Sequence, residues 1–200
     1  FISQLIEQIS LQLSLAHYQY SHTLNLRKKP PRSLKRVMIS TGDSCGVGDA
    51  RRAVLAGTAT GQGANLTREL VNLPGNICTP KYLAGEARRL VRKTKNLSVS
   101  VLDERKMADL GMHSLLSVGN GSDQQSQLIV MKYQGAATKA RPYCLVGKGI
   151  TFDTGGISLK PGAKMDEMKF DMGGAGSVFG ALYAASLMSL PINIVGVIAA

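Results

Sequence analysis

Apolar residues recur at helical spacing along several segments and in short continuous runs along others. From Phe1 to about Tyr20 they occupy every third or fourth position, which predicts an amphipathic helix. Further helices are expected at 49–73, 80–95, 103–110 and 174–190, and strands at 36–40, 97–102, 127–133, 141–146 and 192–199. Because strands alternate with helices, the pattern predicts an α/β fold with a mostly parallel or mixed sheet and flanking helices.

Turn and cap residues set several of these boundaries. Pro74-Gly75 ends the long second helix, because proline lacks the backbone N–H that a helix requires. Thr79 is placed to cap the next helix, with Pro80 at its first position. These residues therefore mark the end of the 49–73 helix and the start of the 80–95 helix.

Composition and cysteine usage point to a globular protein of a reducing compartment. Hydrophobic residues make up 44% of the chain and charged residues 18%, which is typical of a packed core rather than of disorder. The three cysteines, Cys45, Cys78 and Cys144, are widely spaced and form no C-x-x-C motif. We expect ordinary buried or half-buried thiols and a cytoplasmic location.

The net charge of +11 is concentrated in the first half of the chain, above all between Arg27 and Arg36, where six residues are basic and none is acidic. One interpretation is a patch for DNA or another polyanion. A solvated linker is the favoured alternative. The chain has no Trp and no aromatic residue among these bases, which argues against stacking of single-stranded nucleic acid.

A membrane association is not expected. Residues 172–200 carry no charge, but Pro191 and Asn193 interrupt them, and a buried helix followed by a buried strand explains them better than a membrane span. The amino-terminal segment has neither a basic region nor a small-residue cleavage site, so it does not match a signal peptide.

The candidate chemistry lies in a glycine-rich stretch after the 141–146 strand. Lys148, Asp153, Lys160 and Asp171 stand there among glycines that let a backbone and a ligand approach closely. Carboxylates beside lysines suit a site for hard divalent cations and a polarised carbonyl. Each residue alone is more often a turn former or a surface charge. The glycines of 173–180 allow a second hypothesis, that of nucleotide binding. This hypothesis is less favoured because no strand directly precedes these glycines.

The stretch from Val146 to Met172 reads V-G-K-G-I-T-F-D-T-G-G-I-S-L-K-P-G-A-K-M-D-E-M-K-F-D-M. It closely resembles the signature of the leucyl aminopeptidases, the family of two-metal, hexameric cytosol aminopeptidases. Supporting matches lie at Thr67 to Pro80 and at Leu110 to Tyr133, and the resemblance covers roughly residues 35–200. It implies hydrolysis that releases amino-terminal residues from peptides, with a leucine-type preference.

Residue by residue, the resemblance implies a role for each candidate. Lys148 and Asp171 would bind one metal ion, and Asp153 would bridge two ions, each Mn²⁺ or Zn²⁺. Lys160 would be the catalytic lysine, and Met168 would line the pocket for the first substrate side chain. The family also implies a homo-hexamer, and some bacterial members act as DNA-binding regulators.

The sequence begins at Phe1 and ends in an apolar run, so we expect a piece of a longer protein. Residues 1–42 would be the tail of an amino-terminal α/β domain, 43–74 a connecting helix, and 75–200 the first part of the catalytic domain. The family's later N-T-D-A-E-G-R motif, which supplies further carboxylates and an arginine, is not in this sequence. We therefore expect the chain alone to bind metal poorly and to be inactive on peptides.

Overall fold

The computed structural model describes residues 1–24 and 34–200. Most of the basic segment between Arg27 and Arg36 lies outside these residues, so the predicted polyanion patch is not described. The long helices are α1 (Ile2–Ala16), α2 (Val47–Asn72), α3 (Pro80–Lys93) and α6 (Gly173–Met188). The short ones are the 3₁₀ helices η2 (Gly42–Ser44) and η3 (Met165–Met172) and the helices α4 (Glu104–Asp109) and α5 (His113–Gly119). The strands are β1 (Leu97–Leu102), β2 (Leu128–Gln134), β3 (Tyr143–Lys148) and β4 (Asn193–Ala199).

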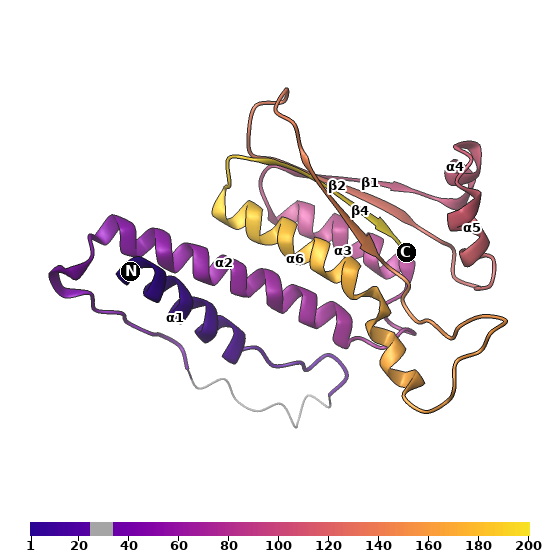
Figure 1. Cartoon of the computed structure of the whole chain (residues 1–200), viewed down its shortest axis with the longest axis horizontal. Helices are drawn as coiled ribbons and strands as arrows, with labels where there is room; N and C mark the ends of the chain where they lie inside the picture. Colours follow the sequence, from indigo (N-terminus) through magenta and orange to yellow (C-terminus); the bar gives the residue numbers. More distant parts are fainter. Residues whose placement is uncertain (25–33) are drawn as a thin grey trace.

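The elements form layers. Helices α3 and α6 lie against one face of the sheet, α2 packs on α6, and α1 packs on α2 (Figure 1). Glycines allow the close approach of these helices, because a Cβ at Gly57 of α2 would collide with the backbone of α1 at Glu7. The layered arrangement places the loops after β3 at one end of the molecule.

The predicted caps are confirmed. Thr79 accepts a hydrogen bond from the backbone N–H of Tyr82 at 3.2 Å, with Pro80 as the first residue of α3. Satisfying a free N–H in the first turn is the reason that threonine is favoured at this position. The long second helix ends at Asn72, next to Pro74-Gly75 as expected.

The sheet is mixed, with the strand order β1-β2-β4-β3. Only β3 and β4 are parallel, joined by the crossover through α6, while β1 pairs with β2 and β2 with β4 in antiparallel fashion. The expectation of a mixed α/β sheet is confirmed and that of a mostly parallel one is wrong. The reason is that β2 runs opposite to both of its neighbours, β1 and β4, so two of the three strand pairs are antiparallel.

Two predicted strand positions need correction. Residues 36–40 form no strand, because the described sheet offers this segment no partner and a single extended segment lacks ladder hydrogen bonds. Strand β3 runs from Tyr143 to Lys148 rather than from Arg141 to Val146. Lys148 is thus the last residue of the strand rather than a residue beyond it.

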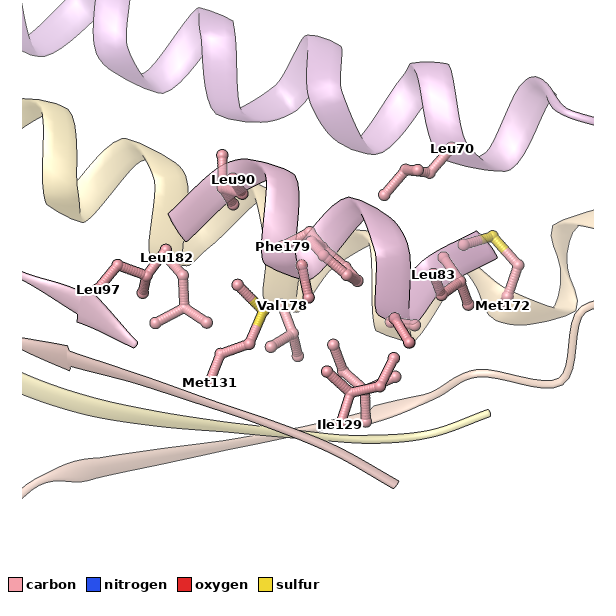
Figure 2. Packing of buried hydrophobic residues seen from close by; sticks show 14 of the residues in the cluster. Leu70, Leu83, Leu90, Leu97, Ile129, Met131, Met172, Val178, Phe179 and Leu182 are labelled. Carbon is pink, nitrogen blue, oxygen red and sulfur yellow. The ribbon is translucent and has the colours of Figure 1, made fainter. Parts of the chain in front are cut away.

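The main core fills the space between the sheet and helices α3 and α6 (Figure 2). Phe179 of α6 is fully buried, with Leu83 of α3 and Met131 of β2 in the same cluster. Met172, which precedes α6, is also fully buried. This core anchors the start of α6 against the sheet.

The three thiols differ in exposure. Cys78 is buried, and this burial raises its pKa to about 11. Cys45 is half-buried, but Cys144 is exposed, contrary to the expectation of buried or half-buried thiols. Cys144 lies on β3, which is an edge strand of the described sheet, and an edge strand is less covered than a central one.

Within residues 1–24 and 34–200, none of the helices combines the length and the apolar character that a membrane span requires.

Candidate metal centre

The candidate residues lie along one continuous path from the end of β3 to the start of α6. Lys148 ends β3, and Asp153 and Lys160 lie in the loop that leaves the sheet beyond it (Figure 1). Asp171 lies in η3, which leads directly into α6. The parallel crossover from β3 through α6 to β4 returns the chain to the same sheet, so both ends of the path meet near the end of β3.

Lys148 and Asp171, although far apart in sequence, form an ion pair. The Lys148 Nζ and Asp171 Oδ2 atoms are 2.8 Å apart. Asp171 Oδ2 is buried and has no donor in hydrogen-bonding geometry among the described residues, so this contact is its charge compensation. The contact with Asp171 is the largest cause that raises the pKa of the Lys148 amine, and the charge of Asp153 adds to it.

Asp153 and Lys160 form the second pair, within a single tight loop. Lys160 Nζ donates to Asp153 Oδ2 at 2.8 Å, and the Gly155 N–H donates to Asp153 Oδ1 at 2.8 Å. Gly155 has a φ of +92°, a conformation that side chains disfavour, and the Lys160 N–H closes the loop on Thr154 O at 2.9 Å. The hydrogen bond from Lys160 is the largest cause that lowers the pKa of Asp153, followed by that from Gly155.

The two ion pairs lie close enough to influence each other. The positive charge of Lys148 contributes to the lowered pKa of Asp153, and the negative charge of Asp153 contributes to the raised pKa of Lys148. The structure thus brings together the four charged residues that the sequence singled out. Their roles in binding and catalysis stay predictions.

Met168 lies in η3, three residues before Asp171, and is half-buried. Its predicted contact with a substrate side chain is not tested by this geometry. Asp166 and Glu167 lie in the first turn of η3.

The chemistry of these groups fits a divalent cation in part. Asp171 Oδ2 is a buried carboxylate oxygen whose charge is compensated by the Lys148 ammonium group, and a divalent cation could take over this compensation. Lys148 could join it only as a neutral amine, since the protonated form has no lone pair, so a cation would have to displace its proton. Among the described residues no cluster of three or more His, Cys, Asp or Glu side chains could hold a metal ion. The donor set is therefore suitable in kind and short in number.

One known protein family matches the part of the chain that contains this site. Residues 65–200 match the catalytic domain of the cytosol aminopeptidase family. The chain belongs to the cytosol aminopeptidase family. The match includes all four charged residues of the site and the elements that carry them.

Two bacterial relatives from this family illustrate the similarity. The chain is 47% identical over 195 residues to the probable cytosol aminopeptidase of Alkalilimnicola ehrlichii, covering 98% of this chain and 39% of the relative. It is 53% identical over 173 residues to that of Pseudomonas fluorescens strain Pf0-1, covering 86% of this chain and 35% of the relative. The chain thus spans well under half the length of the curated cytosol aminopeptidases that it matches.

Solved structures agree with the cytosol aminopeptidase assignment. The bottromycin maturation enzyme BotP in complex with Mn superposes with a TM-score of 0.83 at 31% identity, over 98% of this chain and 39% of BotP. The cytosol aminopeptidase of Coxiella burnetii superposes with a TM-score of 0.77 at 26% identity, over the same shares of the two chains. The α/β arrangement described above is therefore shared with these larger proteins.

The sequence did not reveal how the four charges pair or that η3 would form. Beside Lys148 and Asp171, Gly147 and Gly174 let β3 and α6 approach each other closely. The glycine crowding noted in the sequence was the available signal for this contact. The division into residues 1–42, 43–74 and 75–200 stays a prediction.

Proposed function

We propose that the full-length protein that carries these 200 residues is a metal-dependent aminopeptidase. The observation that carries the proposal is that Lys148 pairs with Asp171, and Lys160 with Asp153, between the end of β3 and the start of α6 in a chain of this family. Two carboxylates and two amines at one point provide both cation ligands and a donor for a developing negative charge. The substrates would be peptides with a free amino terminus and a leucine-type first residue.

The proposed roles are those that the resemblance to the family implies, and the positions of the side chains are compatible with them. Lys148 and Asp171 would hold one cation, because they already lie 2.8 Å apart at a buried carboxylate oxygen. Asp153 would share its carboxylate between two cations. When bound, two divalent ions, Mn²⁺ or Zn²⁺, supply Lewis acidity that polarises the scissile carbonyl and favours the ionised form of water. The similar enzyme BotP has been solved in complex with Mn, which supports Mn²⁺ as the first ion to test.

Lys160 would act on the substrate rather than on a cation. Its ammonium group is tied to Asp153 at 2.8 Å, which places a positive charge beside the proposed cation site. From there it would donate a hydrogen bond to the carbonyl oxygen as negative charge develops on it. Met168 would supply apolar contact for the first side chain of the peptide.

The 200-residue chain by itself would bind metal weakly. Its two carboxylates are matched by two ammonium groups, so the site has no net negative charge to hold two divalent cations. No third acidic, His or Cys ligand joins them among the described residues. Further carboxylates would have to come from the parts of the protein outside this chain.

Metal removal tests the proposal. We expect the full-length protein to hydrolyse a leucine anilide, to lose this activity after exhaustive chelation, and to regain it with Mn²⁺ or Zn²⁺, because the carbonyl is poorly polarised without the cations. The measurement is the initial rate before chelation, after it and after metal is restored.

The isolated 200-residue chain is the matched comparison in the same assay. It should release anilide at least about 100-fold more slowly than the full-length protein, because its ligand set is incomplete. Full activity of the chelated protein, or a rate for the isolated chain near that of the full-length protein, contradicts the proposal.

Three further expectations remain predictions: a homo-hexamer, DNA binding and a cytoplasmic location. The relatives are named cytosol aminopeptidases, which supports the location. The DNA alternative has no support from the described residues, because the basic segment lies mostly outside them.

A further inference from the structure

Gly147, near the end of β3, and Gly174, near the start of α6, pack main chain against main chain. A Cβ at Gly147 would lie 2.6 Å from Gly174 O and 2.8 Å from Ala175 N. In the other direction, a Cβ at Gly174 would lie 2.9 Å from Lys148 N. All three neighbours are backbone atoms, which cannot rotate away as the end of a side chain can. A methyl group at either position therefore has to push β3 and α6 apart.

Steric closeness, rather than backbone conformation, is the reason for glycine here. The glycines with positive φ among the described residues are Gly42, Gly111, Gly155 and Gly156, and neither Gly147 nor Gly174 is among them. An alanine could adopt the backbone angles of both positions. What it could not do is fit between the two elements.

This contact lies between the two candidate ligands of one cation. Lys148 directly follows Gly147, and Asp171 lies three residues before Gly174. The gap between β3 and α6 at the glycines therefore governs the 2.8 Å approach of Lys148 Nζ to Asp171 Oδ2. Carbon and backbone atoms pack best at about 3.5–4.0 Å, so a new methyl group would widen the gap by roughly 1 Å.

We propose that Gly147 and Gly174 are positioning residues of the candidate metal centre, whose backbone contact holds Lys148 and Asp171 at the separation that allows them to share one cation. The inference rests on the proposed function, because it takes Lys148 and Asp171 to be ligands of the same ion. Metal–ligand distances vary by only about 0.2 Å in well-formed sites, so a displacement of roughly 1 Å is large on this scale.

Gly173 supplies the matched control for a test. It lies beside Gly174 in the first turn of α6, but a Cβ there would meet only Val71 Cγ1, at 3.9 Å, which is ordinary contact. We expect Gly174→Ala to weaken Mn²⁺ binding by the full-length protein at least about 10-fold, and Gly173→Ala to leave it unchanged. Titration of free Mn²⁺ by electron paramagnetic resonance measures the affinity, and the thermal midpoint of the metal-free variants separates it from stability. Equal losses in the two variants, or no loss in Gly174→Ala, overturn the inference.

A double-mutant cycle separates this inference from the proposed function. If Gly174 acts by placing Asp171, the Gly174→Ala effect on Mn²⁺ affinity disappears in an Asp171→Asn background. A Gly174→Ala effect that persists in that background overturns the positioning role. If Asp171→Asn alone leaves the affinity unchanged, the proposed ligand assignment fails independently of the glycines.

Amide hydrogen exchange on the unaltered full-length protein covers the case in which Gly174→Ala does not fold. Mn²⁺ should slow exchange at both Lys148 and Gly174, because the cation fixes the two facing backbones together. Exchange at Gly121, in a remote loop, should not change. Exchange at Lys148 and Gly174 that is the same with and without Mn²⁺ contradicts the positioning role.

Discussion

Replacement of Lys160 by Met should lower kcat of the full-length protein on a leucine anilide about 100- to 1000-fold, the usual cost of removing one donor to a developing oxyanion. Methionine keeps an unbranched apolar stem and removes the ammonium group that lies 2.8 Å from Asp153. We expect KM to change little, because the interaction is made in the transition state. Steady-state kinetics on the purified variant measures both constants.

Lys164→Met is the matched control for this substitution. Lys164 is an exposed lysine at the end of the same loop, and it forms no ion pair with the described residues. The Lys164→Met variant should have the same kcat as the unaltered protein. The Lys160–Asp153 pair is partly exposed and such pairs contribute little stability, so a fall in kcat would not reflect unfolding. Comparable kcat values for the two variants would contradict a catalytic role for Lys160.

Phe179→Ala should lower the free energy of unfolding by about 3–5 kcal/mol, because it removes a large side chain from a close-packed core and leaves a cavity. Phe179 of α6 is 0% exposed and belongs to the buried cluster that also includes residues of α3 and of the sheet (Figure 2). Urea unfolding of the 200-residue chain, followed by far-ultraviolet circular dichroism, measures the change.

Phe170→Ala is the matched control, because it makes the same substitution at an exposed position. The Phe170 side chain is 47% exposed, so its loss should change the free energy of unfolding by about 0.5 kcal/mol or less. Similar losses for Phe179→Ala and Phe170→Ala would show that the described core is not where the stability of the chain resides.

Local chemistry made many of the elements predictable. Thr79 and Pro80 define the start of α3, and Pro74 the end of α2, because caps and proline act within a few residues of themselves. The burial of the uncharged helix α6 also followed from composition. Such signals need no knowledge of the tertiary structure.

The features that could not be predicted depend on contacts between distant segments. The insertion of β4 between β2 and β3 follows from strand pairing, which single-strand patterns do not encode. The expected strand at 36–40 failed for the same reason, since it has no partner in the described sheet. In the site, the motif identified the four charges, but the pairing of Lys148 with Asp171 depends on the packing of β3 against α6.

Anomalous diffraction at the manganese edge, from crystals of the full-length protein grown with Mn²⁺, tests directly whether these four charged residues form a two-metal site. We expect two peaks at the end of β3, one within bonding distance of Lys148 Nζ and an Asp171 oxygen, with Asp153 reaching both and Lys160 released from its pair with Asp153. Mn²⁺ peaks elsewhere in the protein, with the Lys148–Asp171 and Lys160–Asp153 ion pairs intact, would contradict it.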